Sequence, residues 1–137
     1  MMGRPRYRFM TLTIRTQREP NRVITLINVF TVEPANQQRL LDLLTRATDE
    51  FVCQATGFIS ATLHRSLDGS KVTMYAQWRS EEDYQAMRAD PDPLPLFKEA
   101  LTFATFDPGI YEVVRTFTPD GRYRAANAQT IEKPRPG

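Results

Sequence analysis

The segment that most constrains the fold is residues 23–32, which are rich in β-branched and aromatic side chains. This composition predicts a β-strand. Alternate side chains of a strand point to opposite faces of its sheet, and both faces of this segment are largely apolar. We therefore expect the strand to be covered on both sides. Asn28, between Leu26 and Phe30, is the polar exception in its row.

The hydrophobic periodicity of the following segments predicts further elements. Apolar residues at helical spacing follow Pro34, and Gly57 is placed to end that helix. A hairpin dipeptide at 68–69 joins two alternating segments, and Ser80 begins a capping box. The predicted elements are strands at 23–32, 58–67, 71–79 and 109–118, helices at 34–55 and 80–89, and a short helical turn at 96–103.

The order of these elements is strand, helix, strand, strand, helix, strand, which predicts an α+β fold of the ferredoxin-like βαββαβ kind. Such a fold has a four-stranded antiparallel sheet with both helices on one face. The other face has no helix to cover it, yet it receives apolar residues from the first strand (Val23, Ile27, Val29) and the last (Tyr111, Val113, Phe117). We therefore predict a homodimer with two sheets packed face to face, a dimeric α+β barrel.

Length and composition fit one domain in a soluble protein. We expect a flexible arm at residues 1–20, the domain at 21–118 and a flexible tail at 119–137. A net charge of +2 gives no indication of nucleic acid binding, and no apolar run is long enough to span a membrane. The single cysteine, Cys53, excludes an internal disulfide and is consistent with the cytoplasm.

Residue spacing excludes several kinds of site. His64 is the only histidine, and no carboxylates cluster at ligand spacing, so we expect no metal. There is no glycine-rich phosphate loop or dinucleotide fingerprint, so we expect neither flavin nor nicotinamide. A two-residue hairpin loop at 68–69 would place Leu63 opposite Met74 and Ile59 opposite Trp78 on one sheet face. Asn28 is the most informative single residue, because an amide in an apolar row must find a hydrogen bond or a ligand.

Three segments resemble the antibiotic biosynthesis monooxygenase family: INVFTV at 27–32, GFISATLH at 57–64 and YAQWRSEE at 75–82. The resemblance covers residues 23–118. It implies a dimer with a pocket between sheet and helices in each protomer, and oxidation of a small aromatic or polyketide-like substrate by O2 without any cofactor. It assigns catalytic roles to Asn28, Trp78 and Tyr84. Substrate contacts are expected from Phe30, Leu63, Met74 and Lys98.

One departure from the family pattern leaves alternatives open. Several quinone-forming members carry a second asparagine at the place of Met74, and a methionine cannot donate a hydrogen bond. The leading hypothesis is a monooxygenase acting on an anthrone or hydroquinone. The alternatives are a non-catalytic protein that binds a small hydrophobic ligand, and a small isomerase or signal-degrading enzyme. Haem degradation is disfavoured because residues 81–103 contain no histidine.

Overall fold

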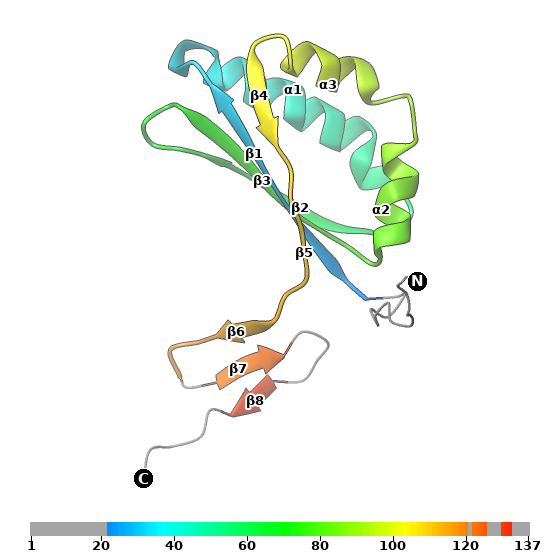
Figure 1. The fold of residues 1–137 in the computed structure, drawn as a ribbon, viewed down its shortest axis with the longest axis vertical. Coiled ribbons are helices and arrows are strands. Elements are labelled where there is room, and N and C mark those ends of the chain that lie inside the picture. The colour runs from blue at the N-terminus through cyan, green and yellow to red at the C-terminus, as the bar shows by residue number, and fades with distance from the viewer. Residues whose placement is uncertain (1–21, 121, 126–129, 133–137) are drawn as a thin grey trace, which may run out of the picture.

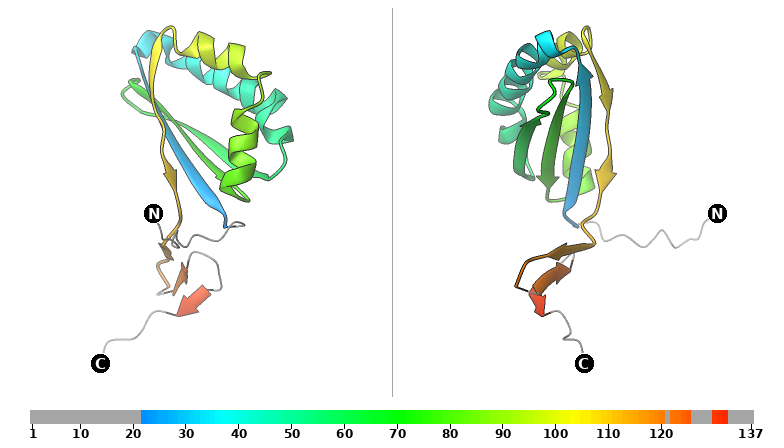
Figure 2. Two further views of the ribbon diagram at one scale, coloured as in Figure 1. Left: turned by 45° about the vertical axis from the view of Figure 1, so that its right-hand side comes forward. Right: turned by 90° about the vertical axis from the view of Figure 1, so that its left-hand side faces the viewer.

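A computed structural model of the chain describes residues 22–120, 122–125 and 130–132. One antiparallel sheet has the strand order β2-β3-β1-β4, and β5 also pairs with β1. These strands are β1 (Ile24–Val32), β2 (Phe58–Arg65), β3 (Lys71–Trp78), β4 (Ala104–Asp107) and β5 (Ile110–Tyr111). The helices α1 (Gln37–Glu50), α2 (Glu81–Arg88) and α3 (Leu94–Ala100) cover one face of the sheet (Figures 1 and 2). The ferredoxin-like α+β fold is thereby confirmed.

The two faces of β1 differ in burial. Leu26 and Phe30 point under the helices and are almost fully buried, whereas Asn28 between them is only half-buried. On the opposite face, Ile27 and Val29 are half-buried. The apolar residues on both sides of β1 thus reflect one face packed against helices and one open face, within this single chain.

The hairpin between β2 and β3 keeps the predicted register over most of its length. Leu63 pairs with Met74 as expected. The expected pairing of Ile59 with Trp78 is wrong, because a bulge shifts the register and Phe58 takes that position. An extra residue in a bulge is left unpaired, and the Ile59 side chain is 49% exposed.

The first predicted helix is divided into three parts. A 3-10 turn, η2 (Pro34–Asn36), precedes α1, and a second 3-10 turn, η3 (Val52–Gln54), follows it. Gly57 comes after η3 with a φ of 85° and meets the start of α2, where a Cβ would lie 2.4 Å from an Asp83 oxygen. The Ser80 hydroxyl accepts a hydrogen bond from the Asp83 backbone N–H, so the predicted cap of α2 is confirmed.

The last strand of the sheet begins earlier than the predicted 109–118. It starts at Ala104 in β4, is interrupted at Pro108, which has no N–H to donate, and resumes in β5. The Gly109 carbonyl still accepts a hydrogen bond from Ile27 N. The predicted helical turn at 96–103 is correspondingly displaced to α3. The chain leaves the sheet after Tyr111, so Val113 and Phe117 do not belong to its open face.

Beyond the main sheet, β6 (Arg115–Phe117), β7 (Arg122–Ala125) and β8 (Thr130–Glu132) form a separate three-stranded antiparallel sheet. Figure 1 shows it past the end of β5, away from the helices. Two of these strands lie within residues 119–137, so part of the expected tail has regular structure. Its flexibility stays a prediction, and the expected arm at 1–20 lies outside the described residues. No described helix combines the length and hydropathy needed to cross a membrane.

Candidate active site

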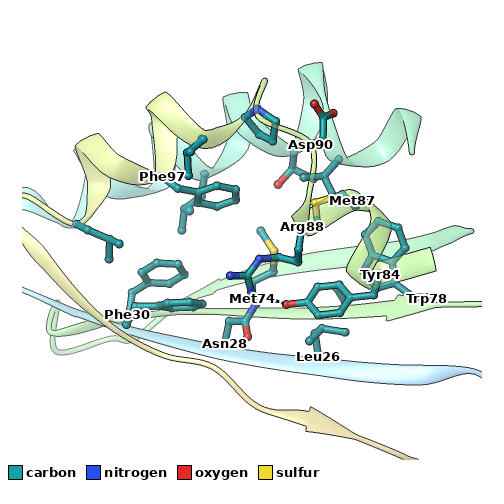
Figure 3. Close-up of a pocket in the computed structure, with 18 residues that line it drawn as sticks. Leu26, Asn28, Phe30, Met74, Trp78, Tyr84, Met87, Arg88, Asp90 and Phe97 are labelled. Carbon is teal, nitrogen blue, oxygen red and sulfur yellow. Dashed lines mark hydrogen bonds between the residues drawn. The ribbon is translucent and has the colours of Figure 1, made fainter. Parts of the chain in front are cut away.

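A pocket of about 230 Å³ lies between the sheet and the three helices (Figure 3). Its wall is mostly apolar, with a few polar side chains among the lining residues. The lining residues are Leu26, Asn28, Phe30, Leu44, Thr48, Val52, Met74, Ala76, Trp78, Tyr84, Met87, Arg88, Asp90, Pro93, Leu94, Phe97, Leu101 and Phe106. An apolar cavity with a few convergent polar groups is the usual form of a small-molecule site.

Asn28 contributes the polar group of the sheet floor. Its backbone pairs with Met74 across β1 and β3, and its side chain points into the pocket (Figure 3). The Asn28 Oδ1 atom is buried and has no hydrogen-bond partner among the described residues. An unsatisfied buried acceptor costs about 1–3 kcal/mol, so its presence calls for an explanation. A ligand hydroxyl in the pocket would satisfy it.

Trp78 and Tyr84 form the aromatic end of the pocket. Trp78 is 1% exposed and packs edge-on against Phe58, with ring centroids 5.5 Å apart, and against Tyr84, with centroids 5.8 Å apart. Because the Trp78 ring is fixed on two sides, it provides a rigid wall rather than a mobile one. The Tyr84 hydroxyl reaches the cavity and accepts a hydrogen bond from Arg88 Nη1 at 3.0 Å.

The basic residue of the pocket is Arg88, which the sequence analysis missed. The expected residue, Lys98, is exposed on α3 and does not line the cavity, whereas its neighbour Phe97 does. Successive helical residues are about 100° apart around the axis, so Phe97 facing the pocket turns Lys98 toward solvent. Arg88 lies four residues after Tyr84 on α2, and this i, i+4 spacing is the signal that places both side chains on one face.

Of the other three residues expected to contact the substrate, two line the pocket and one does not. Phe30 and Met74 line the pocket, and Phe30 stacks on Phe106 with ring centroids 4.7 Å apart. Leu63 does not line it. Leu63 pairs with Met74 from the outer strand β2, so Met74 stands between it and Asn28 in the cross-strand row. Its half-buried side chain packs against the core instead.

The described part of the chain contains no group of three or more His, Cys, Asp or Glu side chains that could hold a metal ion. The polar groups that line this pocket are the Asn28 amide, the Thr48 hydroxyl, the Trp78 indole, the Tyr84 phenol, the Arg88 guanidinium and the Asp90 carboxylate. These groups can hold a neutral or anionic oxygen and exchange a proton with it. They suit a ligand with an apolar ring system that carries oxygen atoms at one end.

The fold and the pocket define a ferredoxin-like α+β domain with a small-molecule site between sheet and helices. The chain belongs to the antibiotic biosynthesis monooxygenase family, whose sequence profile matches residues 23–99. It is 42% identical over 102 residues to tetracenomycin-F1 monooxygenase of Streptomyces glaucescens, a match that covers 72% of this chain and 91% of that protein.

Two solved structures share the fold at similar coverage. The monooxygenase ActVA-Orf6 of Streptomyces coelicolor, solved with the ligand nanaomycin D, is 30% identical with a TM-score of 0.65, covering 74% of this chain and 96% of its own. SnoaB of Streptomyces nogalater, a cofactor-independent oxygenase, is 25% identical with a TM-score of 0.62, covering 72% and 98%. All three relatives are described as oxygenases or monooxygenases, which sets the class of chemistry to consider for this pocket.

Proposed function

We propose that this protein is a cofactor-independent monooxygenase that oxidises a small aromatic or polyketide-like substrate of the anthrone or hydroquinone type with O2. The observation that carries the proposal is the convergence of Asn28, Trp78 and Tyr84 on one apolar pocket, with Asn28 Oδ1 lacking a partner among the described residues. The 42% identity to tetracenomycin-F1 monooxygenase supports the same class of reaction.

Without a cofactor, the chemistry requires the substrate to supply all four electrons that reduce O2. For an anthrone, the CH2 group loses a proton to give an enolate, and its carbon reacts with O2 to form a hydroperoxide. Loss of water from the hydroperoxide leaves a ketone, so that CH2 and O2 become C=O and H2O. Asn28 Nδ2 would donate to the enolate oxygen, which stabilises the developing charge. Tyr84 would exchange a proton with the substrate, and Trp78 would exclude water from the reacting carbon.

The test is oxygen uptake with a panel of anthrones and hydroquinones, followed by product mass after reaction under ¹⁸O2. One labelled oxygen in the product is expected. Asn28→Ala should reduce kcat at least tenfold, since loss of one oxyanion donor commonly costs that much or more. Asn36→Ala is the matched control, because Asn36 lies in η2 outside the pocket. An unchanged kcat in Asn28→Ala would refute the catalytic role of Asn28.

A second candidate is a protein that binds such a ligand without oxidising it. The observation that favours it is Met74, which pairs with Asn28 and offers no hydrogen-bond donor beside it. The two candidates differ in outcome. A binder would retain hydroxyanthraquinones in equilibrium dialysis but consume no O2 with any reduced substrate.

We also propose that the protein works without flavin, haem or metal. Absorption spectra and metal analysis of the active purified protein test this directly. Stoichiometric flavin, haem or metal, with activity lost on its removal, would overturn it.

We further propose that the open face of the sheet pairs with a second copy of this chain. Tyr75, 36% exposed, lies opposite Ile27 on that face. Tyr75→Asp should convert a dimer to a monomer in sedimentation equilibrium, because it would bury an unpaired charge. Leu67→Asp, on a side chain that is fully exposed in the hairpin loop, is the control. A wild-type monomer would contradict the proposal.

A further inference from the structure

Arg88 is the only cationic side chain among the residues that line the pocket. It is the last residue of α2, and Figure 3 shows its guanidinium descending from that helix into the cavity toward Asn28. One of its five N–H groups is used, by the hydrogen bond from Nη1 to the Tyr84 hydroxyl. The remaining donors are available to a ligand.

No carboxylate forms an ion pair with Arg88 in the described part of the chain. The ion pairs of residues 22–120 join other residues, and none includes Arg88. The Asp90 carboxylate lines the same pocket, where its Oδ1 accepts a hydrogen bond from the Asp92 backbone, and no ion pair joins it to Arg88. A guanidinium that enters a mostly apolar cavity without a counter-ion attracts an anion.

We infer that Arg88 is the anion-binding residue of this pocket and holds the ionised oxygen of a phenol or enolised ketone. The inference deepens the proposed function and rests on it for the identity of the ligand class. Arg88 thereby supplies the donor that Met74 lacks beside Asn28, from the helix side of the pocket and not from the sheet. Asn28 Oδ1, which has no partner in the part of the chain that the structure describes, can then accept a hydrogen bond from a second hydroxyl that stays protonated.

This arrangement determines which substrates fit. A ring system with one acidic oxygen and a neighbouring hydroxyl satisfies both Arg88 and Asn28. A hydrocarbon of the same shape would leave the amide oxygen unsatisfied and the cation without an anionic partner, each at a cost in affinity. The protein should therefore select the anionic form of a polycyclic phenol over its neutral form.

The test uses a dihydroxyanthraquinone dye, alizarin, which is already oxidised and changes colour when its phenol ionises. Absorbance titration against pH gives the pKa of the dye free and bound. A positive charge within about 4–6 Å lowers the pKa of an acid by about 1–3. Because Arg88 is exposed to solvent, we expect the pKa of bound alizarin to fall by about 1. That corresponds to about tenfold tighter binding of the anion.

Four variants separate the effect of the cation from other effects. Arg88→Gln should return the pKa of bound alizarin to its free value, and Arg88→Lys should retain part of the change. Tyr84→Phe removes the hydroxyl that Arg88 contacts. The lowered pKa of bound alizarin should persist in this variant, because the charge of Arg88 remains. Lys98→Gln, on the exposed side of α3, should behave as the wild type. Because Arg88 is itself exposed, its variants are expected to fold, which thermal melts will verify.

The outcomes distinguish this inference from the proposed monooxygenase activity. Four outcomes would each overturn the role of Arg88. The wild type could fail to bind the dye, or bind it without changing its pKa. The pKa shift could also survive in Arg88→Gln, or be lost in Lys98→Gln. Oxygen uptake with an anthrone tests the activity separately. An Arg88-dependent shift without any oxygen uptake would support the anion site and refute the monooxygenase.

Discussion

Replacing Asn28 with leucine should make the protein more stable and less active. Leucine has the same branched shape as asparagine, but it carries two methyl groups in place of the amide oxygen and nitrogen. Asn28 Oδ1 is buried without a hydrogen-bond partner among residues 22–120, 122–125 and 130–132, at a cost of about 1–3 kcal/mol. The adjoining pocket of about 230 Å³ provides room for the larger methyl groups, so overpacking should be small.

Because Asn28 is only half-buried, we take the lower part of that range. The free energy of unfolding of Asn28→Leu should rise by about 1–2 kcal/mol. For a domain of this size, each kcal/mol raises Tm by about 4–8 °C. Urea unfolding at one fixed protein concentration measures the change, since a dimer would make the midpoint depend on concentration. The slope with urea should stay constant.

The matched control is Met74→Leu, which changes the residue opposite Asn28 without removing a polar group. Volume-conserving apolar substitutions usually change stability by less than about 1.5 kcal/mol, and we expect Met74→Leu to lower the free energy of unfolding by no more than that. If the Asn28→Leu variant is no more stable than the wild type, the amide is not kept for function at the expense of stability. Oxygen uptake by the same variant should fall to background.

Three further predictions concern the framework around the site. Gln37→Ala removes two side-chain hydrogen bonds to backbone carbonyls of the β2–β3 hairpin. It should lower the free energy of unfolding by about 1–3 kcal/mol, whereas Gln38→Ala, at an exposed position, should lower it by less than about 0.5 kcal/mol. Hydrogen bonds, first that from the backbone N–H two residues on, lower the pKa of Asp68 from 3.8 to about 2. Its contribution to stability is therefore fully present above about pH 3.8 and is lost as the pH falls through about 2, and a carboxyl ¹³C titration of Asp68 with a midpoint near 3.8 would contradict this. Gly57→Ala should destabilise by more than about 1 kcal/mol in urea unfolding, because φ is 85° and the new Cβ would meet Asp83 at 2.4 Å; a neutral substitution would show that α2 can shift freely.

The order of elements was accessible from the sequence because it depends on short-range patterns. The β-branched and aromatic composition of 23–32, the hairpin dipeptide at 68–69 and the cap at Ser80 each act through residues close in the chain. Where a pairing depended on a local irregularity, the prediction was wrong. The bulge at Ile59 and the break at Pro108 both move strand positions by amounts that periodicity does not encode.

The sequence by itself determined that Asn28 would be the exceptional polar residue of an apolar strand, and that the chain has the family's pattern around Trp78 and Tyr84. The tertiary structure decided which residues share a cavity. It turned Lys98 to solvent, placed Leu63 behind Met74, and brought Arg88 into the pocket. The physical reason is that a side chain's face depends on where its helix or strand docks. Docking is set by packing between elements distant in sequence, whereas the identity of a polar residue in an apolar row is visible in the row itself.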